Sequence, residues 1–510
     1  MSRRGPLMLG LGLLVAGLIA GALLLRRAAE PVAPLQPTRL FEQVFNQVRR
    51  FGVDSLSESE LYRRAADGLL GQLEDEYATL LPAGSDLGLA ERPDVGGLGM
   101  LLATRDARVS VLSVLPGSPA DLAGVAAGDQ LLEAGGIPLD AERRDQVLAS
   151  LDGPPGTTLE IRVRRPGLGV LGFTLVRRAA LAEVVSRGIK LDDRVGYIAV
   201  RLLGPGAVRG VRREVEELSR QGVGALVLDL RGASQGSLDE AIELADYLLE
   251  PVASVVEVRG RGPDPRRVGD DTPQDRRVAL LPVIALVDSG TADAGEVVAG
   301  ALQDNDRALL LGEPTFGRGL TPETFPLADK MTIRMSTGRW YTPSGRPIQR
   351  DTATSDTLTN RPQLPTAGGR KVYSGGGIVP DSVMHRDTLT AAQLAFVRAI
   401  GSEWGKWRLT TRAVATTLST DLPPGQDPII GAPQRASLHA ALEKEGVSIP
   451  ADIWQGGSDL VDRVLGDEIV RAAQGEEALM RRRVKRDRLV LKAMDLLRGA
   501  TTATSLVLGK

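Results

Sequence analysis

Thr291-Ala-Asp-Ala-Gly-Glu296 opens an apolar stretch, Val297-Val-Ala-Gly-Ala-Leu-Gln-Asp304, and Thr315-Phe-Gly-Arg-Gly319 follows a short distance later. A hydroxyl residue before the apolar stretch and a glutamate at its start are typical of a helix N-terminus. These residues therefore predict a loop, a helix and a second loop. An acidic residue stands in the first loop and a basic residue in the second.

The two loops resemble the catalytic core of the carboxyl-terminal processing peptidases, or tail-specific proteases, of peptidase family S41. In that family a Ser-Ala-Ser-Ala-Ser-Glu segment opens the helix, and a Thr-Phe-Gly-Lys-Gly segment follows. The segments align here without a gap, so the resemblance places the family's serine nucleophile at Asp293 and its general-base lysine at Arg318. An assisting glutamine of the family falls on Pro322. The resemblance thus implies a peptidase scaffold in which three reacting positions are substituted.

The substituted residues cannot repeat the chemistry of a serine–lysine dyad. A desolvated lysine can be neutral near pH 7 and accept the proton of the hydroxyl, whereas the arginine guanidinium stays protonated, with a pKa above about 12. Attack by the carboxylate of Asp293 on an amide would produce a high-energy anhydride. We therefore expect Asp293 and Arg318 to face each other as an ion pair, for which a bidentate contact is one form. The alternative is that both side chains point to solvent.

The segment that would supply an oxyanion hole also differs from the family. Val227-Leu-Asp-Leu-Arg-Gly232 predicts an apolar strand that ends in a turn, as in the family. Ala233-Ser-Gln-Gly236 then stands where the family has Asn-Pro-Gly-Gly. Paired glycines let the backbone turn an amide toward a developing oxyanion, and only one of the pair remains. We place the oxyanion-like positions at Gly236 and Ala294.

Other side chains could act as a nucleophile or base. Ser289 and Thr291 stand just before the helix, and Lys330 is the nearest lysine. The two histidines, His385 and His439, lie beyond this region. Ser289 and Thr291 are better explained as a turn residue and a helix cap. Peptidase activity rescued by one of them stays open as the alternative.

Composition excludes several classes of function. The 510 residues, 43% of them hydrophobic, permit two to four domains with ordinary cores. The formal net charge of -2 gives no indication of nucleic-acid binding. The absence of cysteine excludes disulfides, thiolate catalysis and cysteine-ligated metals, and two distant histidines argue against a zinc site. We expect no metal and no cofactor.

Gly5 to Leu25 is an uncharged run of 21 residues between Arg3-Arg4 and Arg26-Arg27. This length is enough to cross a bilayer as a helix. A cleaved signal peptide is the alternative, because Ala20 and Ala22 are small residues at which cleavage could occur. We expect an uncleaved transmembrane anchor. With the family's usual location, the bulk of the chain would then lie in the periplasm or cell envelope.

Residues 86–180 resemble a PDZ domain. The loop Gly97-Leu-Gly-Met100, that is Gly97, Leu98, Gly99 and Met100, matches the carboxylate-binding loop of these domains. Gly117-Ser-Pro-Ala-Asp-Leu-Ala-Gly-Val-Ala-Ala-Gly-Asp129 is the more distinctive match. PDZ domains bind a C-terminal carboxylate with successive backbone amides, and the peptide adds a strand to a sheet edge. The resemblance implies unfolded or C-terminal peptides as ligands. The alternative is a domain that packs on its own protease core without a ligand.

Strand and helix patterns alternate between residues 181 and 384, which predicts an α/β core with a largely parallel sheet. Within it, Gly338-Arg-Trp-Tyr-Thr-Pro-Ser-Gly-Arg-Pro-Ile-Gln349 and Gly375-Gly-Gly-Ile-Val-Pro-Asp381 match the family's closing motifs. We therefore expect a multidomain α/β protein. Its predicted parts are an anchor and linker (1–35), a helical segment (36–85), a PDZ-like domain (86–180), a tail-specific-protease-like α/β core (181–384) and a helical C-terminal region (385–510).

These observations lead to one functional hypothesis and two rivals. The hypothesis is a pseudopeptidase that binds peptides or protein C-termini through its PDZ-like domain and acts as an adaptor. Its partners would be an active peptidase relative or a second copy of the chain. The first rival is an active serine-type endopeptidase that processes envelope proteins, and the second is a structural protein of envelope assembly.

Overall fold

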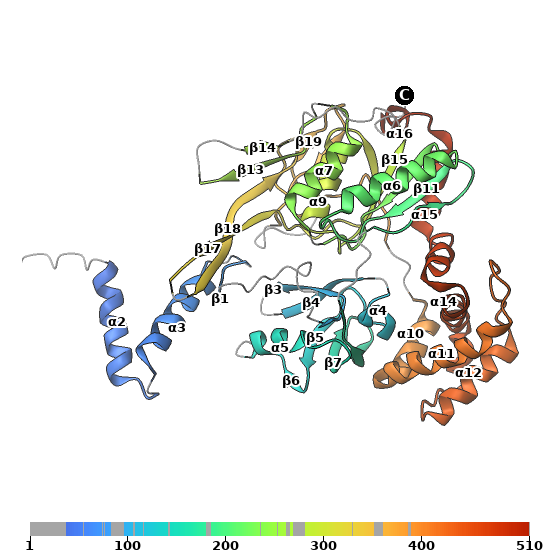
Figure 1. The fold of residues 1–510 in the computed structure, drawn as a ribbon, viewed down its shortest axis with the longest axis horizontal. Coiled ribbons are helices and arrows are strands. Elements are labelled where there is room, and N and C mark those ends of the chain that lie inside the picture. Colours follow the sequence, from blue (N-terminus) through green and yellow to red (C-terminus); the bar gives the residue numbers. More distant parts are fainter. Residues whose placement is uncertain are drawn as a thin grey trace, which may run out of the picture. The chain divides into compact units, whose positions relative to one another are not determined.

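A computed structural model gives the fold of the chain (Figure 1). It describes residues 37–54, 56–73, 75, 77–82, 96–105, 108–115, 117–140, 143–179, 185–234, 236–251, 253–261, 266–268, 281–328, 330–350, 361–385 and 389–508. The chain divides into two compact units, Met1–Leu80 and Leu81–Lys510.

The first unit contains two described helices, α2 (Pro37–Phe51) and α3 (Glu58–Gly71). Ser57 caps α3, because its hydroxyl accepts a hydrogen bond from the amide of Glu60 at 3.2 Å. In the described part of the chain, no helix is both long enough and apolar enough to cross a membrane. The predicted anchor, Gly5 to Leu25, lies outside the described residues.

The PDZ-like region is built around an antiparallel sheet in the order β3-β4-β5-β7-β8. Every second side chain of β7 is buried, which is the pattern of a strand with one face on a core. β3 ends the strand order, so one of its edges has no partner among the strands described in this sheet. The elements are β2 (Gly96–Gly97), β3 (Met100–Arg105), β4 (Arg108–Val114), α4 (Pro119–Ala123), β5 (Gln130–Ala134), β6 (Ile137–Pro138), α5 (Arg144–Leu151), β7 (Thr158–Arg165), β8 (Gly169–Val176) and β9 (Arg178–Ala179).

The core of the second unit is a six-stranded sheet in the order β10-β11-β12-β15-β16-β21, and the pairs from β11 onward are parallel. The prediction of a largely parallel sheet is therefore confirmed. Both faces of β11, β12 and β15 are buried, and their sequences are apolar apart from Asp229, which ends β12 and pairs with Arg201 and Arg231. The strands are β10 (Ile189–Lys190), β11 (Val195–Ala199), β12 (Ala225–Asp229), β15 (Val283–Val287), β16 (Ala308–Gly312) and β21 (Ser382–Val383).

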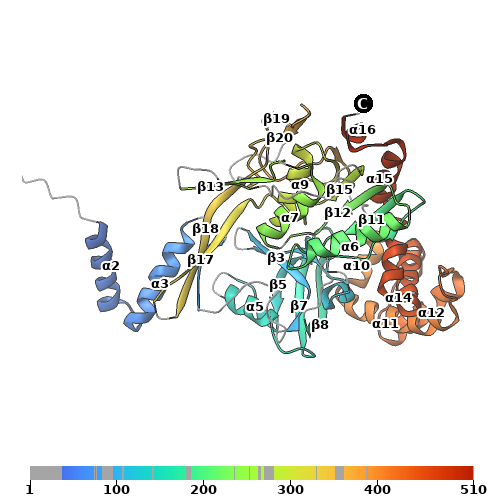
Figure 2. The same cartoon turned by 45° about the horizontal axis from the view of Figure 1, so that its top comes forward.

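Helices cover the two faces of this sheet. On one face, α6 (Ala207–Arg220), α7 (Leu238–Leu248) and α9 (Ala294–Asp304) pack in one apolar cluster with Leu226 and Leu228 of β12. The residue between these leucines, Val227, points to the other face and packs in a second cluster with α15 (Arg488–Gly499). Figures 1 and 2 show α15 across the sheet from α6 and α7. A helix from the end of the chain thus completes the core.

A second sheet carries the long hairpin of β17 and β18, with β13 along β18 and β14 along β13. β17 begins one residue after Gly319, so the hairpin continues directly from the second predicted loop. The strands of this hairpin sheet include β13 (Val256–Gly260), β14 (Arg266–Val268), β17 (Leu320–Pro326) and β18 (Met331–Tyr341). β19 (Gln363–Pro365) and β20 (Lys371–Tyr373) pair with each other in a separate two-stranded sheet, and β1 is Thr79–Pro82.

The C-terminal region is helical, as predicted, and its first part packs on the PDZ-like sheet. Residues of α10, α11 and α14 share one apolar cluster with the core of that sheet, and α11 contacts β8 (Figure 2). The helices are α10 (Ala391–Ile400), η2 (Gly401–Glu403), α11 (Trp404–Leu418), η3 (Ser419–Asp421), α12 (Ala432–Lys444), α13 (Ala451–Gly456), α14 (Ser458–Val484), α15 and α16 (Ala503–Leu508).

Candidate functional site

Asp293 lies in the sharp turn that joins β15 to α9 and is the residue immediately before α9. Its backbone has φ 48° and ψ -119°. Non-glycine residues rarely adopt this conformation, which costs about 1–3 kcal/mol and persists only where the surrounding structure holds it. The fold therefore has a strained turn at Asp293, the position predicted to correspond to the family's nucleophile.

Arg318 faces Asp293 across this turn. Its Nη1 lies 3.3 Å from Oδ2 of Asp293, and the two side chains are 11% and 14% exposed. The guanidinium also stacks over the ring of Phe316, with its carbon 4.9 Å from the ring centroid. The predicted ion pair is therefore formed, and it is mostly buried.

Glu296 fixes the loop that carries Arg318. Its carboxylate is fully buried and accepts hydrogen bonds from the amides of Gly317 and Arg318, each at 2.7 Å, and from the hydroxyl of Thr315. These bonds tie the second loop to the first turn of α9, so Arg318 must emerge opposite Asp293. Sequence reasoning assigned Glu296 only to the helix dipole. The signal that it missed is a charged residue in a helix that is otherwise small and apolar as far as Leu302.

Glu296 should make stability depend on pH. Burial raises the pKa of this carboxyl from 4.5 to about 8, although its three donors oppose the shift. The folded state then binds more protons than the unfolded state between these values. The free energy of unfolding should fall as pH rises through this window, by at most about 1.4 kcal/mol per pH unit. Denaturant titrations at pH 5, 6.5 and 8 should show this fall in the parent and a flatter profile in Glu296→Gln. Parallel profiles would contradict the assignment.

The alternative nucleophiles have other roles or positions. Thr291 is fully buried, and its hydroxyl donates to the carbonyl of Leu230 at 2.9 Å and accepts from the amide of Asp288 at 3.1 Å. It therefore closes the turn after β15. Ser289 is exposed in the same turn, whereas Lys330 lies in the turn between β17 and β18.

The two predicted oxyanion-like positions, Gly236 and Ala294, lie in different surroundings. Gly236 lies against Leu203, where an added Cβ would stand 2.2 Å from the Leu203 carbonyl oxygen. In the same segment, the carbonyl of Ala233 accepts from the amide of Ala292, in the turn before α9, at 3.0 Å. Ala294 is buried as the first residue of α9.

Pro322 lies in β17 opposite Ser336, next to an irregularity in the strand pairing. Proline has neither an amide proton nor a polar side-chain atom. It therefore cannot supply the hydrogen bond that an assisting glutamine would give.

The predicted peptide-binding loop, Gly97–Met100, joins β2 to β3. Leu98 and Met100 are buried in the core of the PDZ-like sheet, and the carbonyl of Gly99 accepts from the amide of Leu115 at 2.9 Å. Gly99 has φ 72°, a conformation that favours glycine. The loop thus lies at the start of β3, one edge of which pairs with no other strand described in this sheet.

The PDZ-like sheet meets the turn of Asp293. Leu112 of β4 packs against Ala292 and Phe316, and the hydroxyl of Ser113 lies 3.1 Å from that of Ser234. A cavity of about 440 Å³ adjoins this contact. Its polar lining includes Ser113, Arg201, Arg231, Asp288, His385 and Asp487. Within the described residues, no group of three His, Asp or Glu side chains could hold a metal ion.

Comparison with known proteins gives the site its context. Residues 194–359 match peptidase family S41, and residues 110–165 match the PDZ domain. A carboxyl-terminal-processing protease of Picosynechococcus sp. is 32% identical over 295 residues, which are 56% of this chain and 70% of that protein. The carboxy-terminal processing protease CtpA of Bacillus subtilis is 23% identical over 339 residues, 66% of this chain and 72% of that protein.

A solved structure shares the fold. The photosystem II D1 C-terminal processing protease aligns with 72% of this chain and 97% of its own, with a TM-score of 0.54 and 23% sequence identity. The parallel sheet and the PDZ-like sheet overlap the residues of the two family matches. The chain therefore belongs to peptidase family S41, with a PDZ domain, as a homologue of the carboxyl-terminal processing proteases.

Proposed function

We propose that this S41 homologue binds unfolded or C-terminal peptides through its PDZ domain and does not hydrolyse them. The observation that carries the proposal is the mostly buried contact between Asp293 and Arg318 at 3.3 Å. A guanidinium cannot accept a proton, and a carboxylate paired with it is a poor nucleophile toward an amide. The chain would then act as an adaptor, or as the partner of an active relative or of a second copy.

The rest of the site supports binding without hydrolysis. Thr291 is buried in its turn, so its hydroxyl is not placed to attack a peptide. The amide of Gly232 donates to Asp288 at 2.9 Å, so it is not available to an oxyanion. The scaffold around Asp293 is nevertheless intact, because Glu296 still anchors the opposite loop. The proposed loss therefore concerns the reacting groups and not the fold.

An active endopeptidase is the second candidate, favoured by the protease names of the relatives. It would need Ser289, whose side chain is exposed in the turn before Asp293. Hydrolysis of an unfolded protein that disappears in Ser289→Ala would establish this candidate.

We also propose that the chain is anchored in a membrane with its bulk in the cell envelope, because the uncharged run from Gly5 to Leu25 is long enough to cross a bilayer as a helix.

Replacing Gly99 with alanine should abolish peptide binding. An added Cβ would lie 2.1 Å from Cβ of Ser118, and φ is 72°, so the loop would have to move. Fluorescence anisotropy with peptides that end in a free carboxylate measures the effect on the full chain. Amidation of the peptide terminus should weaken binding to the parent about tenfold or more, which is about 1.4 kcal/mol.

Two control variants distinguish a specific effect on the peptide-binding loop from general destabilisation of the fold. Gly136→Ala has a similar φ of 77° and open space around it, so it should bind like the parent. Gly99→Ala combined with Ser118→Gly removes the overlap and should recover part of the affinity. Mass spectrometry of the recovered peptide should find it intact. Unchanged binding in Gly99→Ala would exclude this loop, and cleaved peptide would favour the active endopeptidase. A fixed stoichiometric partner without any peptide ligand would favour the structural protein.

A further inference from the structure

The helix α2 has a continuous apolar face. Leucine, valine and phenylalanine recur along it at spacings of three and four residues, so they lie on one side of the helix. With about 3.6 residues per turn, they occupy an arc of about 140°, which is wider than the narrow seam of a coiled coil. The residues of this apolar face are Leu40, Phe41, Val44, Phe45, Val48 and Phe51. The helix is therefore strongly amphipathic.

Most of the apolar face is exposed. None of the residues of α2 is buried, and the exposed fractions of Val44 and Phe51 are 56% and 69%. Phe45 is half-buried instead, because its ring stacks on that of Tyr62 in α3 with the two centroids 4.3 Å apart. One residue of the face thus attaches α2 to its neighbour, and the other five side chains remain exposed.

The opposite side of α2 is polar and mainly basic. It carries Arg39, Arg49 and Arg50, whereas Glu42 is the one acidic residue of the helix. Arg49 also pairs with Glu58 at the start of α3, at 3.4 Å. Helices that lie in a membrane interface have basic residues on the polar side and phenylalanine and leucine on the other. Helices that pair with each other commonly carry both glutamate and lysine beside the apolar seam. The charges of α2 therefore favour an anionic surface over a second helix.

The position of α2 in the chain also favours a membrane as the occupant of its apolar face. Only the 11 residues 26–36 separate it from the uncharged run Gly5 to Leu25, the proposed anchor. A stretch of this length reaches at most about 40 Å when fully extended. An anchored chain would therefore keep α2 close to the headgroups, where the bilayer has a high effective concentration.

We propose that α2 is an interfacial helix that lies along the surface of an anionic bilayer. Its apolar face would enter the boundary between headgroups and acyl chains to a depth of about 5–10 Å, and its arginines would add electrostatic attraction to the anionic headgroups. The first unit would then be held on the membrane by two contacts, the anchor and α2. The inference rests on the proposed anchor for the nearness of the bilayer, whereas the amphipathic pattern of α2 is independent of it.

The absence of cysteine lets a single label report the depth of α2 in the full chain. A fluorescent label on Val44→Cys probes the apolar face, and the same label on Asn46→Cys probes the opposite side. The full chain is reconstituted in vesicles of phosphatidylcholine and phosphatidylglycerol, with and without a nitroxide quencher on the lipid acyl chains. The nitroxide should quench the label at position 44 about twofold or more, while the label at position 46 should change little.

A double variant removes the apolar contact without touching the fold. Leu40→Ser/Val48→Ser changes two side chains that are about half exposed, so it should fold like the parent and lose the quenching at position 44. Gln43→Ser/Gln47→Ser makes the same number of changes on α2 outside the apolar face and should keep the quenching. Equal quenching in both double variants would overturn the proposal.

The lipid composition tests the role of the arginines. Vesicles of phosphatidylcholine alone have no net charge, so they should quench the label at position 44 less than vesicles with phosphatidylglycerol. Equal quenching in the two kinds of vesicle would contradict an anionic surface as the partner.

Two further measurements separate this inference from its alternatives. Efficient disulfide formation between two copies of Val44→Cys, with an unquenched label, would overturn the proposal and assign the face to a second copy of the chain. Alkaline carbonate extraction tests the anchor by itself. A chain that resists extraction but has an unquenched label would refute the interfacial helix and leave the anchor standing. A chain that is extracted, yet is quenched at position 44 before extraction, would support the helix and refute the anchor.

Discussion

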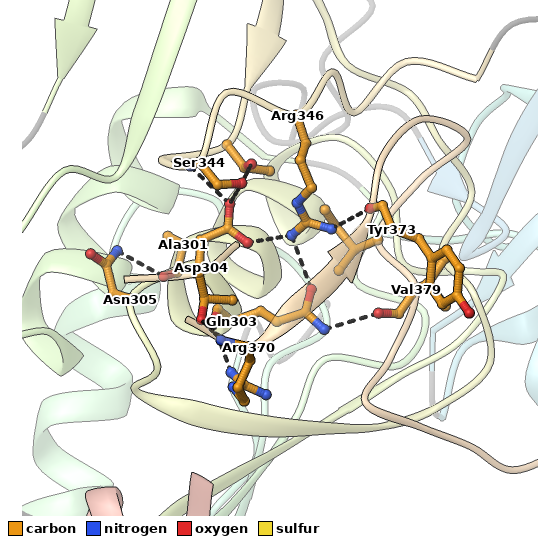
Figure 3. Close-up of polar contacts among 12 residues, drawn as sticks. Ala301, Gln303, Asp304, Asn305, Ser344, Arg346, Arg370, Tyr373 and Val379 are labelled. Carbon is orange, nitrogen blue, oxygen red and sulfur yellow. Dashed lines mark hydrogen bonds and ion pairs between the residues drawn. The ribbon is translucent and has the colours of Figure 1, made fainter. Parts of the chain in front are cut away.

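Replacing Asp304 with alanine should lower the free energy of unfolding by about 3–5 kcal/mol, because it leaves a buried guanidinium without its carboxylate. Asp304, at the end of α9, accepts from Arg346 and from the amide and hydroxyl of Ser344, at 3.0 and 2.6 Å (Figure 3). Arg346 is fully buried and also donates to Gln303, at 3.0 Å, and to the carbonyl of Tyr373, at 2.7 Å.

Urea denaturation followed by circular dichroism measures this loss. Glu217→Ala is the matched control, since Glu217 pairs with Arg220 at 2.7 Å on the exposed side of α6. Exposed pairs contribute about 0–1 kcal/mol, so this control should unfold close to the parent. Asp304→Ala combined with Arg346→Met removes the stranded charge and should recover part of the loss. Equal destabilisation by Asp304→Ala and Glu217→Ala would mean that the pair is not desolvated in solution.

This cluster explains two motifs that the sequence could only match to a family. The segments 338–349 and 375–381 each reach the end of α9, through Arg346 with Asp304 and through the carbonyl of Val379 with Gln303. Both segments are therefore parts of the frame that holds α9. A motif match identifies these residues, but it does not show which buried polar groups they form hydrogen bonds or ion pairs with.

The central sheet was predictable because its signal is local. β15 is an unbroken apolar run, and β12 is apolar up to its last residue, Asp229; such runs between helical patterns indicate parallel strands buried on both faces. The contact of Asp293 with Arg318 was also predictable, although 25 positions separate them. There the alignment with a known family supplied the long-range information that periodicity lacks.

Other features could not be predicted, since they depend on contacts between distant segments. Arg231 and Asp487 pair although they are 256 positions apart. No local sequence pattern predicts that α15, which begins after Asp487, covers the central sheet.

Packing of the PDZ-like domain on the core was one alternative from the sequence, but the contact of Leu112 with Ala292 could not be identified from it. The placement of Gly236 and Ala294 at oxyanion-like positions stays a prediction. The bond from the amide of Ala292 to the carbonyl of Ala233 joins segments 59 positions apart, which no local pattern indicates.

Restoring the family residues should create a peptidase. The variant Asp293→Ser/Arg318→Lys/Pro322→Gln should hydrolyse an unfolded casein-like substrate at least about 100-fold faster than the parent, the lower range for a positioned general base. The strained turn at Asp293 would present the serine. The bonds from Glu296 to the amides of Gly317 and Arg318 would place the lysine opposite it.

The burial of the site should make the new lysine a base near neutral pH. The present side chains at 293 and 318 are 14% and 11% exposed, and partial desolvation lowers the pKa of a lysine. Hydrolysis by the variant should therefore increase with pH as the lysine loses its proton. A rate that is independent of pH would argue against a lysine base.

Single variants distinguish a restored dyad from a chance gain. Asp293→Ser keeps an arginine that cannot accept a proton, and Arg318→Lys keeps a carboxylate that pairs with the lysine, so both should stay inactive. The gain should appear only when the two changes are combined, which is the non-additivity expected of residues that act as a unit. Hydrolysis by the parent would mean that the nucleophile is another residue, and it would favour the active endopeptidase. A folded, peptide-binding but inactive triple variant would show that Ala233 to Gly236 must also be restored before the oxyanion can be held.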